Sequence, residues 1–177
     1  MLKTTTEHPI FITLPVLAYF GWLFYQHMID PVYFSYLDMV NFWIHEFGHV
    51  FFIFTGNQFI IAAGGTLMQL MIPFIVIISF LRQRDWFGIA FCFGWLGVNF
   101  FYIAIYAWDS IRLDLPLFGL FGKDSIHDWN YMFIEMGVLD YTDSISFGFK
   151  IIAIFCMLIC LGYGSLLVFN KYFTEGR

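Results

Sequence analysis

Five long apolar runs constrain this chain more than any other feature of its sequence. They cover about residues 10–28, 34–55, 60–81, 86–108 and 148–170. A helix of about 20 mostly apolar residues is long enough to cross the hydrocarbon core of a bilayer. Only 12% of the residues are charged, and a chain of 177 residues has too much surface per volume to hide 60% apolar residues from water. We therefore expect an all-α, multi-pass integral membrane protein with about five transmembrane helices.

The runs follow one another closely enough to predict a single transmembrane domain over residues 1–177. The one sizeable segment outside them, about 109–147, is acidic and is expected to lie outside the membrane. The net charge of −5, without a basic cluster, argues against nucleic acid as a partner and leaves the lipid bilayer as the expected surroundings. All three cysteines lie inside apolar runs, which argues against a secreted disulfide framework.

The sharpest motif is HExxH, formed by His45, Glu46 and His49 in the middle of the second run. Residues four apart share one face of a helix, so both imidazoles can reach one metal ion, and neutral imidazoles suit Zn²⁺. Glu46 is offset by about 100° and can take a proton from an activated water as general base. Ionisable groups at this depth in a membrane are costly and are functional by default.

Catalytic zinc usually has three protein ligands, so the third must come from elsewhere in the chain. We predict Asp109, because it ends a polar stripe on the fourth run and leaves that run on the same side as His49. His127 and Asp128 remain alternatives, since their segment lies on that side too and could fold back with Trp129 packing at the interface.

Two buried amides are candidates for contacts with substrate. Gln69 lies in the third run, and Asn99 begins the polar stripe of the fourth. Hydrocarbon offers no hydrogen-bond partner to an amide, so such groups must bond protein or ligand. We predict that Gln69 and Asn99 hold the substrate or stabilise the oxyanion that develops on an attacked carbonyl.

Three stretches together resemble the site-2 protease family of intramembrane zinc metalloproteases. HEFGH (45–49) matches the family's HExxH, AGGTLMQ (63–69) is similar to its AGPxxN-like segment, and NFFYIAIYAWDSIR (99–112) is similar to its N…LDGGR-like segment. The resemblance implies hydrolysis of peptide bonds in membrane-embedded protein or peptide substrates. It also implies that Asp109, spaced from Arg112 as in the family motif, is the third zinc ligand.

The sequence therefore predicts a zinc metalloendopeptidase with Glu46 as general base. The alternative is a catalytically inactive metal-binding membrane scaffold, which would keep the two histidines but lack a complete ligand set. A di-iron desaturase or hydroxylase needs about eight clustered histidines, whereas this chain has five in total.

Overall fold

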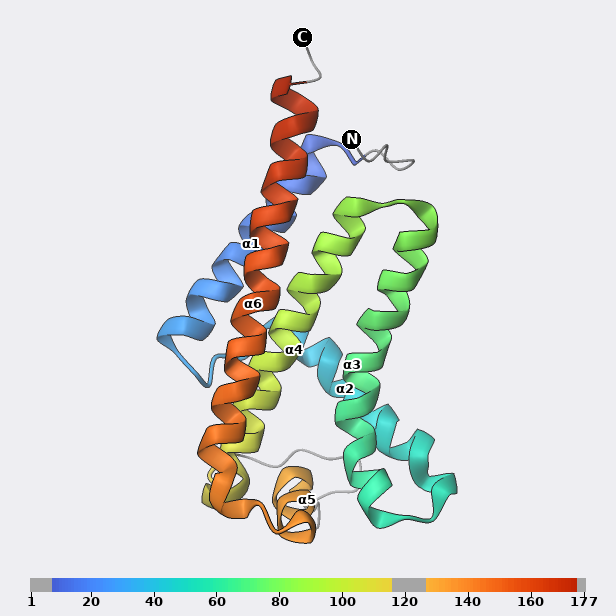
Figure 1. Cartoon of the computed structure of the whole chain (residues 1–177), viewed down its shortest axis with the longest axis vertical. Coiled ribbons are helices and arrows are strands. Elements are labelled where there is room, and N and C mark those ends of the chain that lie inside the picture. The colour runs from blue at the N-terminus through green and yellow to red at the C-terminus, as the bar shows by residue number, and fades with distance from the viewer. Residues whose placement is uncertain (1–7, 116–126, 175–177) are drawn as a thin grey trace.

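The structure, a computed structural model, describes residues 8–115 and 127–174, which form helices with no strand among them (Figure 1). In chain order the helices are α1 (Ile10–Ile29), α2 (Tyr36–Phe52), η1 (Ile53–Thr55), α3 (Gln58–Gln83), α4 (Trp86–Arg112), α5 (Asp128–Met136), η2 (Leu139–Tyr141), α6 (Thr142–Phe169) and η3 (Asn170–Thr174). The expected all-α class is confirmed. Residues 116–126, the middle of the acidic segment, lie outside the described residues.

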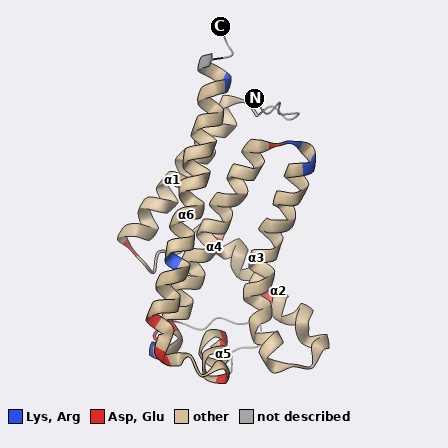
Figure 2. Cartoon of the chain, in the orientation of Figure 1, with Lys and Arg blue, Asp and Glu red and all other residues tan. Residues whose placement is uncertain are grey.

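Four of these helical stretches are long and apolar enough to cross a membrane. They are α1, α3, α4 and the stretch Leu139–Tyr172 that contains α6. Large apolar side chains stay exposed on their surfaces, for example Phe155 at 63%, whereas charged residues gather at the α3–α4 turn and around α5 (Figure 2). A soluble protein would not leave so much apolar surface uncovered. The arrangement is consistent with a multi-pass membrane protein.

The second expected span is the shorter helix α2. Its 17 residues give a length of about 25 Å, less than the roughly 30 Å of a hydrocarbon core, and η1 follows it at once. Four of the five expected spans are therefore candidate membrane-spanning helices, and the count of five stays a prediction. The HExxH motif lies on the remaining one.

α4 is the central helix of the bundle. Of its most apolar stretch 67% is buried, compared with 28% to 39% for the other three candidate spans. Small residues let its neighbours approach: a Cβ on Gly94 would come within 2.8 Å of Cys160 on α6, and one on Gly97 equally close to Met157. Phe20 of α1 joins the buried apolar cluster that α4 and α6 form here.

α2 and α3 pack against each other through glycines. A Cβ on Gly48 would collide with the backbone of Gly64, and one on Gly64 would fall 2.9 Å from the carbonyl oxygen of Gly48. Two helix backbones can come this close only where side chains are absent. The contact places the face of α2 that carries the histidines directly against α3.

α5 closes the end of the bundle where α2, α3 and α4 meet (Figure 1). Its residues Trp129 and Phe133 are buried with Ala62 of α3 and with Ile103 and Ala107 of α4. Burying two aromatic side chains of this size stabilises the contact by several kcal/mol, on the order of 1.5–3 kcal/mol each. The same contact fixes the first residue of α5, Asp128, over the α2–α3 pair.

Candidate metal centre

The histidines of the HExxH motif lie one turn apart on α2, with ring centroids separated by 4.7 Å. The helix starts at a capping box, in which Ser35 and Asp38 exchange hydrogen bonds between side chain and backbone. One turn before His45, Asn41 accepts a hydrogen bond of 2.7 Å from the indole N–H of Trp95 on α4. These contacts fix the rotation of α2 and direct both imidazoles into the protein.

Asp128 meets both imidazoles with a single carboxylate oxygen. Its Oδ2 lies 3.2 Å from His45 Nε2 and 3.2 Å from His49 Nε2. His45, His49 and Asp128 are accordingly a group whose ligand atoms, all within 4.8 Å of one another, could hold a metal ion. The three side chains are buried or nearly so, and they come from two helices that are almost eighty residues apart in the chain.

The hydrogen bonds of the two histidines determine where their protons lie. His45 Nδ1 is 3.0 Å from the Oε1 atom of Gln69, and His49 Nδ1 is 2.8 Å from the carbonyl oxygen of Ile61. Both partners are acceptors, so each Nδ1 carries the proton and each Nε2 presents a lone pair. Metal-binding histidines typically have their second ring nitrogen held in this way.

Two lone pairs and a carboxylate thus converge where a cation fits. Ligand atoms about 2.0–2.1 Å from a zinc ion at a tetrahedral angle lie about 3.3 Å apart, close to the 3.2 Å observed between Asp128 and each imidazole. Without a positive charge between them, three electron-rich atoms in a buried site would repel one another. The donor set therefore fits a metal ion, and its geometry leaves a fourth position for water or substrate.

Gly65 of α3 lies directly under the ring of His45. A Cβ at this position would come within 2.6 Å of both Cδ2 and Cε1 of the imidazole. The AGGTLMQ stretch, which includes Gly65 and Gln69, thus supplies both the space for the ligand and the acceptor that orients it. In the structure this stretch therefore positions the imidazole of His45, a candidate metal ligand.

The structure places Asp109 away from His45 and His49, so the geometry replaces it with the alternative, Asp128, as candidate third ligand. α4 does continue past Asp109, to Arg112. The carboxylate of Asp109, fully buried, instead accepts hydrogen bonds from the backbone N–H groups of Asp114 (2.9 Å) and Leu115 (3.2 Å). The chain after α4 turns back on Asp109, and these hydrogen bonds hold its carboxylate away from the candidate metal centre.

His127, the other alternative, lies outside the candidate ligand group and is the partner of Asp109. Its Nε2 lies 3.3 Å from Asp109 Oδ2, and its Nδ1 accepts a hydrogen bond from the backbone N–H of Asn130 as the N-cap of α5. The Asn130 side chain in turn donates to the carbonyl of Ser110 at 2.7 Å. Asp109 and His127 therefore anchor the start of α5 to the end of α4 and fix the position of Asp128.

The ionisable residues at the start of α5 reflect these contacts. Burial raises the pKa of the Asp128 carboxyl, but in the absence of a metal ion the Nε2 atoms of His45 and His49 can bind protons in its place, and hydrogen bonds and charge from these protonated imidazoles hold the net pKa below its usual value. Burial lowers the pKa of His127, and Asp109 opposes the shift only in part. Asp128 therefore remains an anion at neutral pH, as a metal ligand must.

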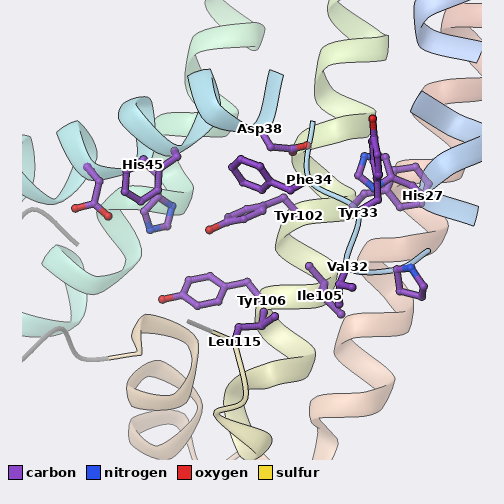
Figure 3. A pocket seen from close by; sticks show the side chains of 14 residues that line it. His27, Val32, Tyr33, Phe34, Asp38, His45, Tyr102, Ile105, Tyr106 and Leu115 are labelled. Carbon is purple, nitrogen blue, oxygen red and sulfur yellow. The ribbon is translucent and has the colours of Figure 1, made fainter. Parts of the chain in front are cut away.

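Glu46 and His45 both line an adjoining cavity of about 420 Å³. Only 6% of Glu46 is exposed. Two tyrosines of α4, Tyr102 and Tyr106, form the opposite wall and direct their hydroxyl groups toward His45 (Figure 3). A carboxylate, two phenols and the imidazole of a candidate metal ligand thus line one cavity, and such groups are suited to proton transfer.

The two amides predicted to contact substrate lie elsewhere in the arrangement. Gln69 is fully buried, and its Oε1 atom is occupied by His45. Asn99 is also fully buried, donates to the backbone carbonyl of Trp95, and is not among the residues that line the cavity. The polar groups that line the cavity instead include the two tyrosines, which belong to the same polar stripe as Asn99.

Sequence reasoning missed the partner of His49, since a backbone carbonyl such as that of Ile61 carries no residue signal. Comparison of the chain with protein-family models, with curated proteins and with solved structures finds no match. The resemblance to the site-2 protease family therefore stays a prediction, and function has to be inferred from the site itself.

Proposed function

We propose that this protein is an intramembrane zinc metalloprotease of the site-2 protease type, which hydrolyses peptide bonds of membrane-embedded substrates. The observation that carries the proposal is the convergence of two imidazole Nε2 atoms on one carboxylate oxygen at 3.2 Å, next to the cavity that Glu46 lines. Two imidazoles and one carboxylate with an open fourth position are the ligand set of zinc peptidases.

His45, His49 and Asp128 would hold the ion, and Gln69 and Ile61 would keep both imidazoles in the ligating tautomer. A zinc ion bound in this way supplies a water activated at neutral pH and polarises a substrate carbonyl. Asp128 also offsets part of the ion's charge, which favours binding in a site with little water.

Glu46 would then accept the proton of the attacking water and deliver it to the leaving amine. Its place in the cavity wall, one residue from a ligand but outside the ligand group, suits a general base. The hydroxyls of Tyr102 and Tyr106, aimed at the same space, would donate hydrogen bonds to the substrate carbonyl oxygen (Figure 3). The cavity would provide space for water at a reaction that takes place among apolar helices.

The test is cleavage of a fluorogenic apolar peptide by the protein in lipid nanodiscs, together with measurement of bound metal. We expect the wild type to contain zinc and cleave, a chelator to stop cleavage, and added zinc to restore it. Glu46→Gln should retain zinc but lose turnover by at least about 10²–10⁴-fold, the typical contribution of a general base.

Glu135→Gln is the matched control, because it removes one carboxylate from an exposed position on α5. It should cleave as the wild type does. Cleavage by Glu46→Gln at the wild-type rate would overturn the mechanism. A zinc-loaded wild type that cleaves no peptide would instead leave the alternative of an inactive metal-binding scaffold.

A further inference from the structure

A second cavity of about 530 Å³ adjoins the one next to the metal ligands. The two cavities have five lining residues in common: His27, Pro31, Val32, Phe101 and Ile105. Phe101 and Ile105 lie on α4, and the cavities open to either side of them, toward Tyr102 and Tyr106 in one case and toward α6 in the other. A ligand bound next to Glu46 can therefore extend around α4 into the second space.

The second cavity has a cation in a mainly apolar lining. Lys150 of α6 lies there, within one of the four helical stretches that are long and apolar enough to cross a membrane. A charged side chain in such a stretch is expensive unless it has a function or a partner. None of the described residues forms an ion pair with it.

The other charged residue of this cavity, Asp143, is already neutralised. Its Oδ1 lies 3.2 Å from the guanidinium of Arg112, which also stacks on Trp108 at 3.7 Å from the ring centre. Lys150 is therefore the uncompensated charge among the described groups of the cavity. A single ammonium group matches the single negative charge of a carboxylate better than the larger charge of a phosphate monoester.

His27 marks the passage between the two cavities. It is 96% buried, its ring stacks on Phe101 with centroids 4.8 Å apart, and its Nε2 atom has no hydrogen-bond partner in the described part of the chain. A buried polar atom without a partner costs free energy. Because this atom is itself covered by protein, His27 forms part of the wall of the passage together with Phe101.

We propose that the second cavity is a specificity subsite that binds a carboxylate of the substrate, with Lys150 as the recognising charge and with His27 and Phe101 as walls of the passage that leads to it. The inference rests on the proposed function, because it assumes that the ligand of the first cavity is a peptide. It names the substrate class: apolar peptides with one acidic group, a side chain or a C-terminus, at a fixed short distance from the bond that is cut.

Binding and cleavage test the proposal separately. The probes are fluorescein-labelled, C-terminally amidated peptides of leucine and alanine, each with one glutamate moved along the chain one position at a time, and matched peptides with glutamine or lysine. Binding is measured by anisotropy to zinc-loaded Glu46→Gln protein in zwitterionic nanodiscs, and cleavage with the wild type. A parallel set with a free C-terminus and no glutamate distinguishes a terminal from a side-chain carboxylate.

We expect the peptide with its carboxylate at one particular position, in the interior or at the terminus, to bind about tenfold more tightly than the matched neutral peptide. Lys150→Met should remove this preference, and Lys150→Glu should transfer it to the lysine peptide. Lys171→Met is the matched control, since it removes the same charge beyond the far end of α6, outside both cavities, and it should leave the preference intact.

Equal binding of acidic and neutral peptides at every position would overturn the proposal. A second pattern would also overturn the proposal: peptide binding that does not depend on peptide charge, weakens when anionic lipid is added to the nanodiscs, and recovers in Lys150→Met. The occupant of the cavity would then be a lipid phosphate. If the charge preference is present but the wild type cleaves no peptide, the subsite stands and the proposed protease activity fails.

Discussion

Replacing Gly65 with alanine probes the metal centre without touching a ligand. The added Cβ would lie 2.6 Å from two carbon atoms of the His45 ring, whereas non-bonded carbons prefer about 3.5–4.0 Å. The ring must therefore retreat by about 1 Å. Distances in metal sites tolerate only about ±0.2 Å, so the retreat takes Nε2 out of the position that Asp128 and His49 define.

Overpacking of this kind costs about 1–3 kcal/mol. If the strain falls on the ligand, zinc affinity should decrease by about 5- to 150-fold, at 1.4 kcal/mol for each factor of ten. Alanine is also favoured over glycine in a helix by up to about 1 kcal/mol. The variant should for this reason keep its helical content while it loses metal.

The assay is competition for zinc between the nanodisc-embedded protein and a chromophoric chelator, with circular dichroism to measure helical content. Gly162→Ala is the control, because nothing lies within 4 Å of a Cβ at that exposed position on α6, and its zinc affinity should be unchanged. Wild-type zinc affinity in Gly65→Ala would refute the assignment of His45 as a ligand held against α3.

Two further predictions concern the other groups of the centre. Asp128→Asn should lower zinc affinity, measured by metal titration, by more than Asp109→Asn does. Asp109→Asn should instead lower the free energy of unfolding, measured with denaturant, by about 1–3 kcal/mol, because it weakens a buried hydrogen-bonded anchor. The reverse order in zinc affinity would restore Asp109 as the ligand. Gln69→Met keeps the volume but removes the acceptor of His45 Nδ1, so zinc affinity should fall by about 10- to 100-fold in the same titration, and an unchanged affinity would show that the tautomer needs no support.

The helices themselves could be predicted to within a few residues from apolar runs, and where the ends differ the cause is local. The fourth run was expected to end at about 108, but α4 continues to Arg112. The Arg112 side chain stacks on Trp108 and donates a hydrogen bond to the backbone carbonyl of Trp108. The last run was expected from about 148, but α6 starts at Thr142, which bonds the carbonyl of Leu139. Hydropathy detects the membrane-crossing part of a helix, whereas capping and side-chain contacts set its ends.

The histidines of the site could be predicted because i and i+4 positions share a helical face whatever the tertiary structure. The third ligand could not be chosen in the same way, since all three candidates were expected on one side of the membrane. Spacing also does not say which carboxylate is held away from the histidines by hydrogen bonds to nearby backbone N–H groups. That choice depends on how residues after Asp109 turn back on it, and on the burial of Trp129 against α3 and α4. Both are tertiary contacts between segments far apart in the sequence.

The Asp109–His127 pair has a physical reason to exist although it binds no metal. A buried carboxylate and imidazole are costly to desolvate, and replacing such a pair with apolar residues is often neutral for stability. Here the pair joins α4 to the residue just before Asp128, and so it fixes the distance of that carboxylate from the two imidazoles. Apolar side chains would hold α5 in place less specifically, because a hydrogen-bonded pair fixes orientation as well as proximity. The buried charges are best understood as the means by which a short helix delivers one oxygen atom to within about 3 Å of two ligands on another helix.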